Sequence, residues 1–241
     1  ELQLPILTRA AALSVLMSES KSVAVAGTHG KTTTSSMVTL IMRAAGMNPS
    51  FVIGSELNEV GTNAAMSSGE WLVVESDESD GSFLKFDLNA AIITNIEKDH
   101  LGFWSTMDRL EAGFEVFAEH VDGPVIFCAD DPVTLRLAQI HRNAVTYGWA
   151  EGADYRVTNY RSGKSGSEFT LEIEGVVAGE LALPLLGSHN AQNATAAAAL
   201  TMSLGVSFED VRSALAGFGG VSRRFQFRGE RDGVTFVDDY A

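Results

Sequence analysis

Cysteine is almost absent from this sequence, since Cys128 is the only one among 241 residues. An internal disulfide is therefore excluded, and a thiol in the apolar run "VIFC" is expected in the core. A reducing compartment suits this pattern, so we expect a cytoplasmic location. No apolar run approaches the ~20 residues that span a bilayer. No basic segment followed by an apolar one marks a signal peptide.

Basic residues are also few: 17 Lys and Arg stand against 31 Asp and Glu, which gives a formal net charge of −14. This balance argues against nucleic acid or a membrane surface as a partner, because either would need a basic face. An anionic ligand can still bind where the local charge is positive, with divalent cations to help. With 45% hydrophobic residues, the chain can bury a core in one large domain, or in one domain with a fragment of another.

Short apolar, β-branched runs alternate with helix-like segments over the first 150 residues. The segments 31–45, 106–120 and 133–140 are predicted helices. We therefore predict an α/β fold in which a mostly parallel P-loop sheet carries helices on both faces. Residues 154–187 alternate apolar and polar side chains, which predicts a smaller antiparallel β subsheet with a turn at "SGKSG".

The last quarter of the chain is predicted to be helical and then extended. One helix begins near Ser188 and stops at Gly205, and a second follows the N-cap Ser207 and runs to about Ala216. Two short strands surround the turn "RDG".

The stretch "VAVAGTHGKTTTSSM" joins a strand to a helix through a glycine-rich turn. Gly27 and Gly30 permit close backbone approach, and N–H groups at the helix start attract phosphate oxygens. Lys31 would reach the β- and γ-phosphates of a nucleotide, and Thr32 would offer its hydroxyl to Mg²⁺. The general loop pattern places a glycine where Val25 stands, so the working unit is the shorter "GTHGKT". An ordinary turn with an exposed lysine is the alternative. The residues predicted to bind nucleotide here are Gly27, Thr28, His29, Gly30, Lys31, Thr32 and Thr33.

Acidic residues follow a second apolar strand, in "WLVVESDESDGSF". Ligands bind at the carboxyl ends of strands in a doubly wound sheet, and four acids there repel one another unless a cation is bound. A solvated acidic loop is the alternative. The acids are Glu75, Asp77, Glu78 and Asp80.

Polar residues also follow a third strand, in "IITNIEKDHLGFW". Among them, His100 could ligate a second Mg²⁺ or orient a substrate group. A single histidine in this position is more often structural, but three strand ends with ligand-type side chains favour the functional interpretation.

Two later segments add groups suited to a nucleotide. Asn190 and Asn193 in "GSHNAQNA" lie three apart on one helical face and suit hydrogen bonds to a base, although asparagine is also a common cap. Arg223 and Arg224 in "GVSRRFQ" could clamp phosphate, or could form a surface ion pair.

Taken in order, these motifs resemble the Mur ligase family. The matching segments are "GTHGKTTT", "ESDESDGSF", "NIEKDH", "HNAQNA", "GVSRRFQ" and "VDDYA". The resemblance implies an ATP-dependent amide-bond ligase of peptidoglycan precursor synthesis that works through an acyl phosphate. The histidine of "GTHGKT" and the doubled acids of "ESDESD" are most similar to the alanine-adding members, which implies UDP-N-acetylmuramate and L-alanine as substrates.

The resemblance also implies roles for single residues. Lys31, His100 and Arg224 would be catalytic, with Arg224 at the γ-phosphate. Thr32 and Glu75 would bind the first Mg²⁺ and His100 a second. Asn190 and Asn193 would lie near the adenine, Asp239 near the ribose, and Asn63 in "GTNAA" on the muramate side.

Two departures from the family pattern stand out. Several relatives use a carbamylated lysine about fifteen residues after the motif histidine, whereas here no lysine lies between Lys98 and Lys164, and Glu115 is near that position. The family has three domains, whereas this chain resembles the central one. We expect residues 1–20 to be a linker or helix that leads from a missing N-terminal UDP-sugar domain, 21–229 to form the central ATP-binding domain, and 230–241 to begin a truncated C-terminal domain.

Other interpretations remain open. A murein-peptide recycling ligase or a folylpolyglutamate synthase relative would share much of this pattern, and the fragment could bind nucleotide without turnover. A P-loop kinase or a switch GTPase is disfavoured by Val25 and by the lack of a base-reading N-K-x-D run.

Overall fold

The computed structural model describes residues 6–221 and 226–239. Arg223 and Arg224, which the sequence proposes as phosphate ligands, lie outside these residues, so their predicted role stays a prediction. Among the described residues, no helix is long and apolar enough to cross a membrane.

Within these described residues, ten strands form the main sheet. Their bounds are β1 Lys21–Ala26, β2 Ser50–Leu57, β3 Thr62–Ala65, β4 Trp71–Glu75, β5 Ala90–Ile93, β6 Val125–Cys128, β7 Ala144–Gly148, β8 Tyr155–Ser162, β9 Ser167–Ile173 and β10 Val176–Leu183. The order across the sheet is β10-β9-β8-β7-β6-β5-β1-β4-β2-β3. All neighbours from β8 to β2 pair in parallel, and only β3, β9 and β10 run antiparallel to their neighbours. The predicted fold class is confirmed, with the antiparallel subsheet continuing the parallel one.

Seven α-helices and one 3₁₀ helix lie before and between the strands in the part of the chain that the structure describes. Their bounds are α1 Arg9–Ser18, α2 Lys31–Ala44, η1 Ser82–Lys85, α3 Leu101–Trp104, α4 Met107–Glu119, α5 Pro132–Ile140, α6 Ser188–Ser203 and α7 Phe208–Ala216. The predicted helices match α2, α4, α5, α6 and α7. The N-cap prediction is confirmed as well, because Ser207 Oγ accepts a hydrogen bond from Asp210 N.

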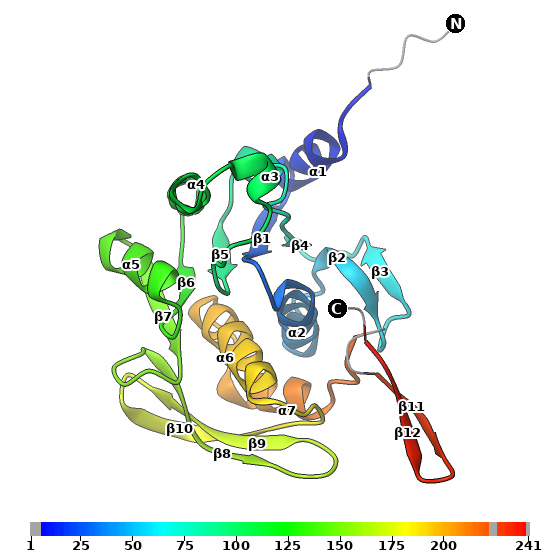
Figure 1. Ribbon diagram of the computed structural model, residues 1–241. Helices are drawn as coiled ribbons and strands as arrows, with labels where there is room; N and C mark the ends of the chain where they lie inside the picture. The colour runs from blue at the N-terminus through cyan, green and yellow to red at the C-terminus, as the bar shows by residue number, and fades with distance from the viewer. Residues whose placement is uncertain (1–5, 222–225, 240–241) are drawn as a thin grey trace, which may run out of the picture.

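The sheet separates two apolar cores, as alternation along β1 shows. Val23 and Val25 pack with α2, α6 and α7 on one face, whereas Ala24 and Ala26 pack with α1, α4 and α5 on the other. Figure 1 shows α2 and α6 together on one side, away from α4 and α5. Cys128 is buried in the first core, as expected, and burial raises the pKa of its thiol to about 11.

The strand order places a switch point beside β1. From β1 the chain passes through α2 to β2 and β4 on one side, and it then crosses to β5 on the other. In doubly wound sheets, ligands bind in the crevice outside the carboxyl ends of strands at such a point. The topology therefore directs attention to the residues that follow β1, β4 and β5.

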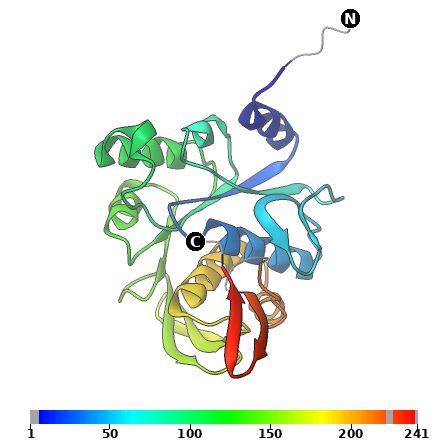
Figure 2. The same cartoon turned by 45° about the vertical axis from the view of Figure 1, so that its right-hand side comes forward.

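The last two strands form a separate hairpin. They are β11 Gln226–Arg231 and β12 Val234–Asp238, and they pair only with each other among the described residues. Figure 2 shows this hairpin standing in front of the helical layer, outside the main sheet. The domain boundary predicted between residues 229 and 230 falls within β11, and the division into domains stays a prediction.

Candidate functional site

The glycine-rich turn between β1 and α2 has the backbone of a phosphate-binding loop. Gly27 has φ +125° and Gly30, the N-cap of α2, has φ +84°. A Cβ at Gly27 would lie 2.2 Å from Thr94 Oγ1, so any larger residue would push the loop off the end of β5. The first N–H groups of α2 lack partners within the helix and point beyond its positive end, which suits an anion.

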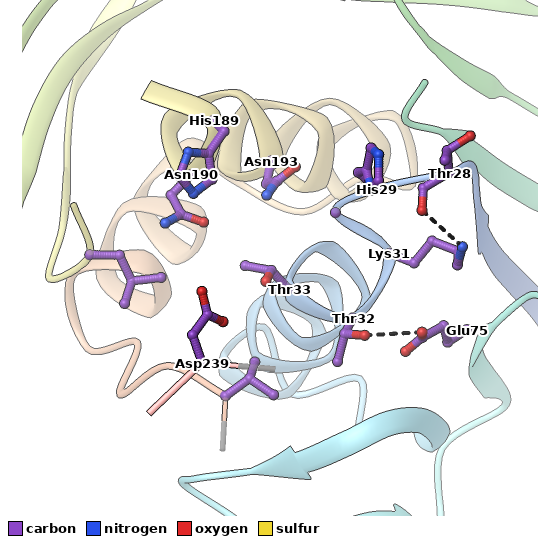
Figure 3. A pocket seen from close by; sticks show the side chains of 13 residues that line it. Thr28, His29, Lys31, Thr32, Thr33, Glu75, His189, Asn190, Asn193 and Asp239 are labelled. Atoms are coloured by element: carbon purple, nitrogen blue, oxygen red, sulfur yellow. Dashed lines mark hydrogen bonds between the residues drawn. The ribbon is translucent and has the colours of Figure 1, made fainter. Parts of the chain in front are cut away.

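A pocket of about 310 Å³ opens above this turn. Figure 3 shows the turn and the start of α2 on one side of it, and side chains of α6 on the other. The lining residues that the sequence predicted are Thr28, His29, Gly30, Lys31, Thr32, Thr33, Glu75, Asn190, Asn193 and Asp239. Leu185, His189 and Val221 complete the lining and were not predicted. Apolar residues such as Leu185 and Val221 carry no signal that separates a pocket wall from a core, whereas His189 stands in the segment "GSHNAQNA" beside the two asparagines that were singled out. Gly27 begins the loop but does not line the pocket.

Lys31 is held by an acidic residue that the sequence did not single out. Its Nζ donates to both carboxylate oxygens of Glu78, at 3.0 Å each, and to the carbonyl oxygens of Gly27 and Thr28. The Glu78 side chain is only 1% exposed. Burial raises the pKa of this carboxyl, and the charge of Lys31 opposes that rise. Its burial and its hydrogen bonds with Lys31 distinguish Glu78 from its three acidic neighbours, and both arise only in the folded chain.

Glu75 occupies a different part of the site. Its Oε1 accepts a hydrogen bond from Thr32 Oγ1 at 3.0 Å, and its Oε2 accepts one from Gly54 N at 2.6 Å. A hydroxyl and an anchored carboxylate therefore lie together beside the loop, and both are oxygen ligands of the kind that Mg²⁺ takes. Among residues 6–221 and 226–239, no group of three or more His, Cys, Asp or Glu side chains converges as a metal site. A cation here would draw further ligands from phosphate or water.

The remaining two acids of the loop, Asp77 and Asp80, accept hydrogen bonds from backbone N–H groups within the loop itself. Asp77 Oδ1 accepts from Ser79 N and Asp80 Oδ1 from Ser82 N, each at 2.9 Å. The hydrogen bonds from Ser82 lower the pKa of Asp80. The four acids thus divide between Thr32, Lys31 and local turns, so they do not converge on a single cation.

His100 lies behind Glu78, outside the lining of the pocket. Its Nε2 is 3.7 Å from Glu78 Oε1 and 3.7 Å from Asp99 Oδ2. The residue adopts φ +52° as the N-cap of α3, and Trp104 of that short helix donates from Nε1 to the Glu78 carbonyl at 2.8 Å. The structure therefore connects Lys31, Glu78 and His100 in one row, and the predicted metal role of His100 stays a prediction.

The two asparagines of α6 reach the loop from the opposite side. Asn190 donates from Nδ2 to the Leu186 carbonyl at 2.8 Å, whereas Asn193 lies against Gly30, where a Cβ would be 2.7 Å from its Oδ1. Alanines make this close approach possible, because small side chains let α6 pack tightly on α2 and the sheet. The fully buried ones are Ala191, Ala194, Ala196, Ala197, Ala198 and Ala199.

Two side predictions lie away from the pocket. Asn63 is an exposed residue of β3 and does not line it. Glu115 is on α4, in a separate groove that it shares with Glu119 and His141, so it does not join the row of Lys31, Glu78 and His100. The carboxylates beside His100 are those of Glu78 and Asp99 instead.

Comparison with known proteins places this geometry in a family. The Mur ligase middle domain matches residues 25–201. The UDP-N-acetylmuramate–L-alanine ligase of Caulobacter sp. (strain K31) is 45% identical over 248 residues, which cover 99% of this chain and 52% of that protein. The chain thus spans about half the length of such curated relatives.

Solved structures agree. The UDP-N-acetylmuramate-alanine ligase of Thermotoga maritima superposes with a TM-score of 0.85 at 31% identity, over 94% of this chain and 52% of that one. A UDP-N-acetylmuramate:L-alanyl-γ-D-glutamyl-meso-diaminopimelate ligase of Neisseria meningitides gives 0.82 at 25% identity, over 92% and 74%. From the match over most of its length and the fold shared with these ligases, this chain belongs to the Mur ligase family, as its middle domain.

Proposed function

We propose that this chain is the ATP-binding part of a ligase that joins L-alanine to UDP-N-acetylmuramate. The observation that carries the proposal is one pocket that combines three groups: the ammonium of Lys31, the Thr32–Glu75 pair and the amide of Asn193. The 45% identity to a curated L-alanine ligase supports the choice of amino acid.

The residues that line the pocket support one orientation of the nucleotide. The triphosphate would lie on the N-terminus of α2, with Lys31 near the β- and γ-phosphates and the N–H groups of Gly30 and Thr32 beneath them. The adenine would face Asn190 and Asn193 on α6, and the ribose would lie near Asp239 (Figure 3). We keep Arg224 as the proposed γ-phosphate ligand.

A divalent cation fits the Thr32–Glu75 pair. The Oγ1 of Thr32 and the Oε1 of Glu75 are 3.0 Å apart, and the bond from Gly54 N fixes the carboxylate in that orientation. When bound, Mg²⁺ there would neutralise charge on the phosphate oxygens. We propose that His100 binds a second Mg²⁺, with carboxylate oxygens of Glu78 and Asp99 each 3.7 Å from its Nε2.

The proposed reaction has two steps. An oxygen of the muramate carboxylate bonds to the γ-phosphorus, the bond to the β–γ bridging oxygen breaks, and ADP leaves. The amine of L-alanine then attacks the acyl carbon, and inorganic phosphate leaves as the amide forms. The chain would contribute by positioning and by opposing negative charge, with Lys31 next to the transferred group.

We propose that this chain is one of three domains of a longer protein. We propose that residues 21–229 form the ATP-binding domain, that residues 1–20 lead from a UDP-sugar domain, and that residues 230–241 begin a third domain. The two apolar cores involve residues between Met17 and Val221, so α1, which belongs to the lead segment, packs on the core of this domain as well. The UDP-sugar and the amino acid would be bound largely by the other two domains.

Phosphate release by the full-length protein tests the proposal. We expect release with ATP, Mg²⁺ and UDP-N-acetylmuramate when L-alanine is present, and much less with other single amino acids. Release with a tripeptide but not with L-alanine would move the assignment to the murein-peptide ligases, whose Neisseria member shares this fold. No release with any amino compound would contradict the ligase assignment.

A further inference from the structure

The end of β5 holds the phosphate-binding loop through one side chain. Asn95 Oδ1 accepts a hydrogen bond from His29 N at 2.8 Å, and Asn95 Nδ2 donates to the His29 carbonyl at 3.1 Å. The main chain takes part too, because Thr28 N donates to the Asn95 carbonyl at 2.9 Å. Asn95 thus pairs with the loop much as a neighbouring strand would.

Residues on either side of Asn95 strengthen this contact. Thr94 Oγ1 donates to the His29 carbonyl at 2.6 Å, and Glu97 N donates to Thr28 Oγ1 at 2.9 Å. Thr94 also occupies the space that a side chain at Gly27 would need. The loop is therefore fixed from β5 and not only by its own connection to β1 and α2.

These bonds decide which N–H groups are left for an anion. The N–H groups of Thr28 and His29 are both used by Asn95. The N–H groups of Gly30, Lys31 and Thr32 start the helix, where intrahelical partners are lacking. A loop that lost Asn95 could turn the N–H of His29 toward the pocket and shift the helix start away from the phosphates.

We propose that Asn95 is a positioning residue that sets the loop so that the first N–H groups of α2 face the phosphates. It would act through the backbone of His29, without touching the nucleotide. The inference rests on the proposed nucleotide site and adds a residue from β5 to it.

The same strand offers a matched control at its other end. Asn89, just before β5, accepts a hydrogen bond from Ser22 N through its Oδ1 at 2.8 Å. Both asparagines are half-buried and both tie β5 to the β1 segment, but Asn89 does so at the end of the sheet away from the pocket. Removing either amide should perturb the strand pair, and only one removal should perturb the loop.

The experiment compares Asn95→Ala and Asn89→Ala in this chain, with the Kd for Mg²⁺·ATP as the readout. We expect Asn95→Ala to weaken binding about tenfold, because two hydrogen bonds that set the loop are lost. Asn89→Ala should stay within about twofold of the parent chain. Without nucleotide, amide hydrogen exchange at His29 should rise in Asn95→Ala and stay unchanged in Asn89→Ala. In the full-length enzyme, the KM for ATP should rise while kcat holds.

Each outcome decides something. Equal affinities for Asn95→Ala and the parent, or equal losses in both alanine variants, would overturn the inference and leave the nucleotide site standing. If the parent chain binds no Mg²⁺·ATP, the proposed function and this inference both fall. If Asn95→Ala does not fold, Asn95→Ser provides the test, because its shorter side chain cannot bridge the N–H and the carbonyl of His29 but keeps a polar group there.

Discussion

The helices on the two faces of the sheet bury different kinds of side chain. On the face covered by α2, α6 and α7, small side chains lie along the helices, with buried alanines on α6 and buried Thr and Ser on α2. Larger side chains of the same core, such as Phe51 and Phe169, come from the strands. The face covered by α1, α4 and α5 uses large ones, and Phe83 packs against Phe114 and Phe117 with ring centroids 5.2 and 5.1 Å apart. We call them the small-residue face and the aromatic face.

The difference reflects what each face has to do. On the small-residue face, two helix starts must come within contact distance, because Asn193 of α6 touches Gly30 at the start of α2. On the aromatic face, volume is filled and apolar area is buried, which stabilises the fold without placing ligand groups. Glu78 links the two faces through hydrogen bonds. Its carbonyl oxygen accepts one from Trp104 on the aromatic face, and its carboxylate accepts two from Lys31 on the small-residue face.

The largest expected effect is on the small-residue face, at Lys31. Lys31→Ala should lower ATP-dependent phosphate release by the full-length protein about 10²–10³-fold, because the charge beside the transferred phosphoryl group is lost. The substitution should also lower the free energy of unfolding, because the carboxylate of Glu78 would be left buried without its partner. The double variant Lys31→Ala/Glu78→Gln should recover that stability in urea denaturation and recover no activity. Near-normal turnover by Lys31→Ala would refute the loop assignment.

The aromatic face should respond in stability alone. Phe114→Ala removes a fully buried ring and should lower the free energy of unfolding by about 3–5 kcal/mol. The Kd of the folded fraction for Mg²⁺·ATP should stay within about twofold. Phe236, which is 52% exposed on β12, supplies the control, and Phe236→Ala should change the unfolding free energy by no more than about 0.5 kcal/mol. A tenfold loss of affinity for Mg²⁺·ATP in Phe114→Ala would contradict the claim that the aromatic face contributes to stability alone.

Overfilling the small-residue face should affect both properties. Ala197→Leu adds volume where α6 is fully buried and should lower the free energy of unfolding by about 1–3 kcal/mol. Because α6 would move away from α2, nucleotide affinity should fall with it. Ala216→Leu, at the exposed end of α7, should leave both quantities unchanged. Calorimetry of unfolding and of nucleotide binding measures the pair, and a stability loss with intact affinity would show that the helix contact does not set the pocket.

The smallest expected effect concerns pH. Burial raises the pKa of Glu78 above its ordinary value of 4.5, so the folded chain holds this proton more tightly than the unfolded chain. Between the two pKa values the unfolded chain binds fewer protons, so the Glu78 contribution to stability falls as pH rises. Relative to Glu78→Gln, the parent chain should therefore lose stability as pH increases above 4.5. A flat difference between the two unfolding free energies across that range would contradict the assigned direction.

Local signals made much of this architecture predictable. The alternation of β-branched runs and helical segments predicted the parallel sheet, and Ser207 predicted the start of α7. The glycines of "GTHGKT" predicted the loop, because their positive φ values are a local requirement. Contacts made across the chain were not predictable in this way. Glu78 differs from Glu75, a residue of the same type, only in what the fold brings to it. The hydrogen bonds between Asn95 and His29 join residues 66 positions apart.

Short elements were also missed. Neither the four-residue α3 nor the four-residue β3 was predicted, because neither repeats its pattern often enough to show a period. The α3 helix matters to the site, since it brings Trp104 to Glu78 and follows the turn at His100. The sequence predicted that His100 lies near the end of the strand, but it could not predict that its ring lies next to the Glu78 carboxylate.

The most direct test of the account is a titration of this chain with adenosine, ADP and ATP in the presence of Mg²⁺, followed by calorimetry, for the parent and for Lys31→Ala. If the pocket above the loop binds a triphosphate, affinity should increase from adenosine to ADP to ATP in the parent, and the gain from the phosphates should largely vanish in Lys31→Ala. Equal affinity for the three ligands, or a gain from phosphates that survives the loss of Lys31, would contradict it.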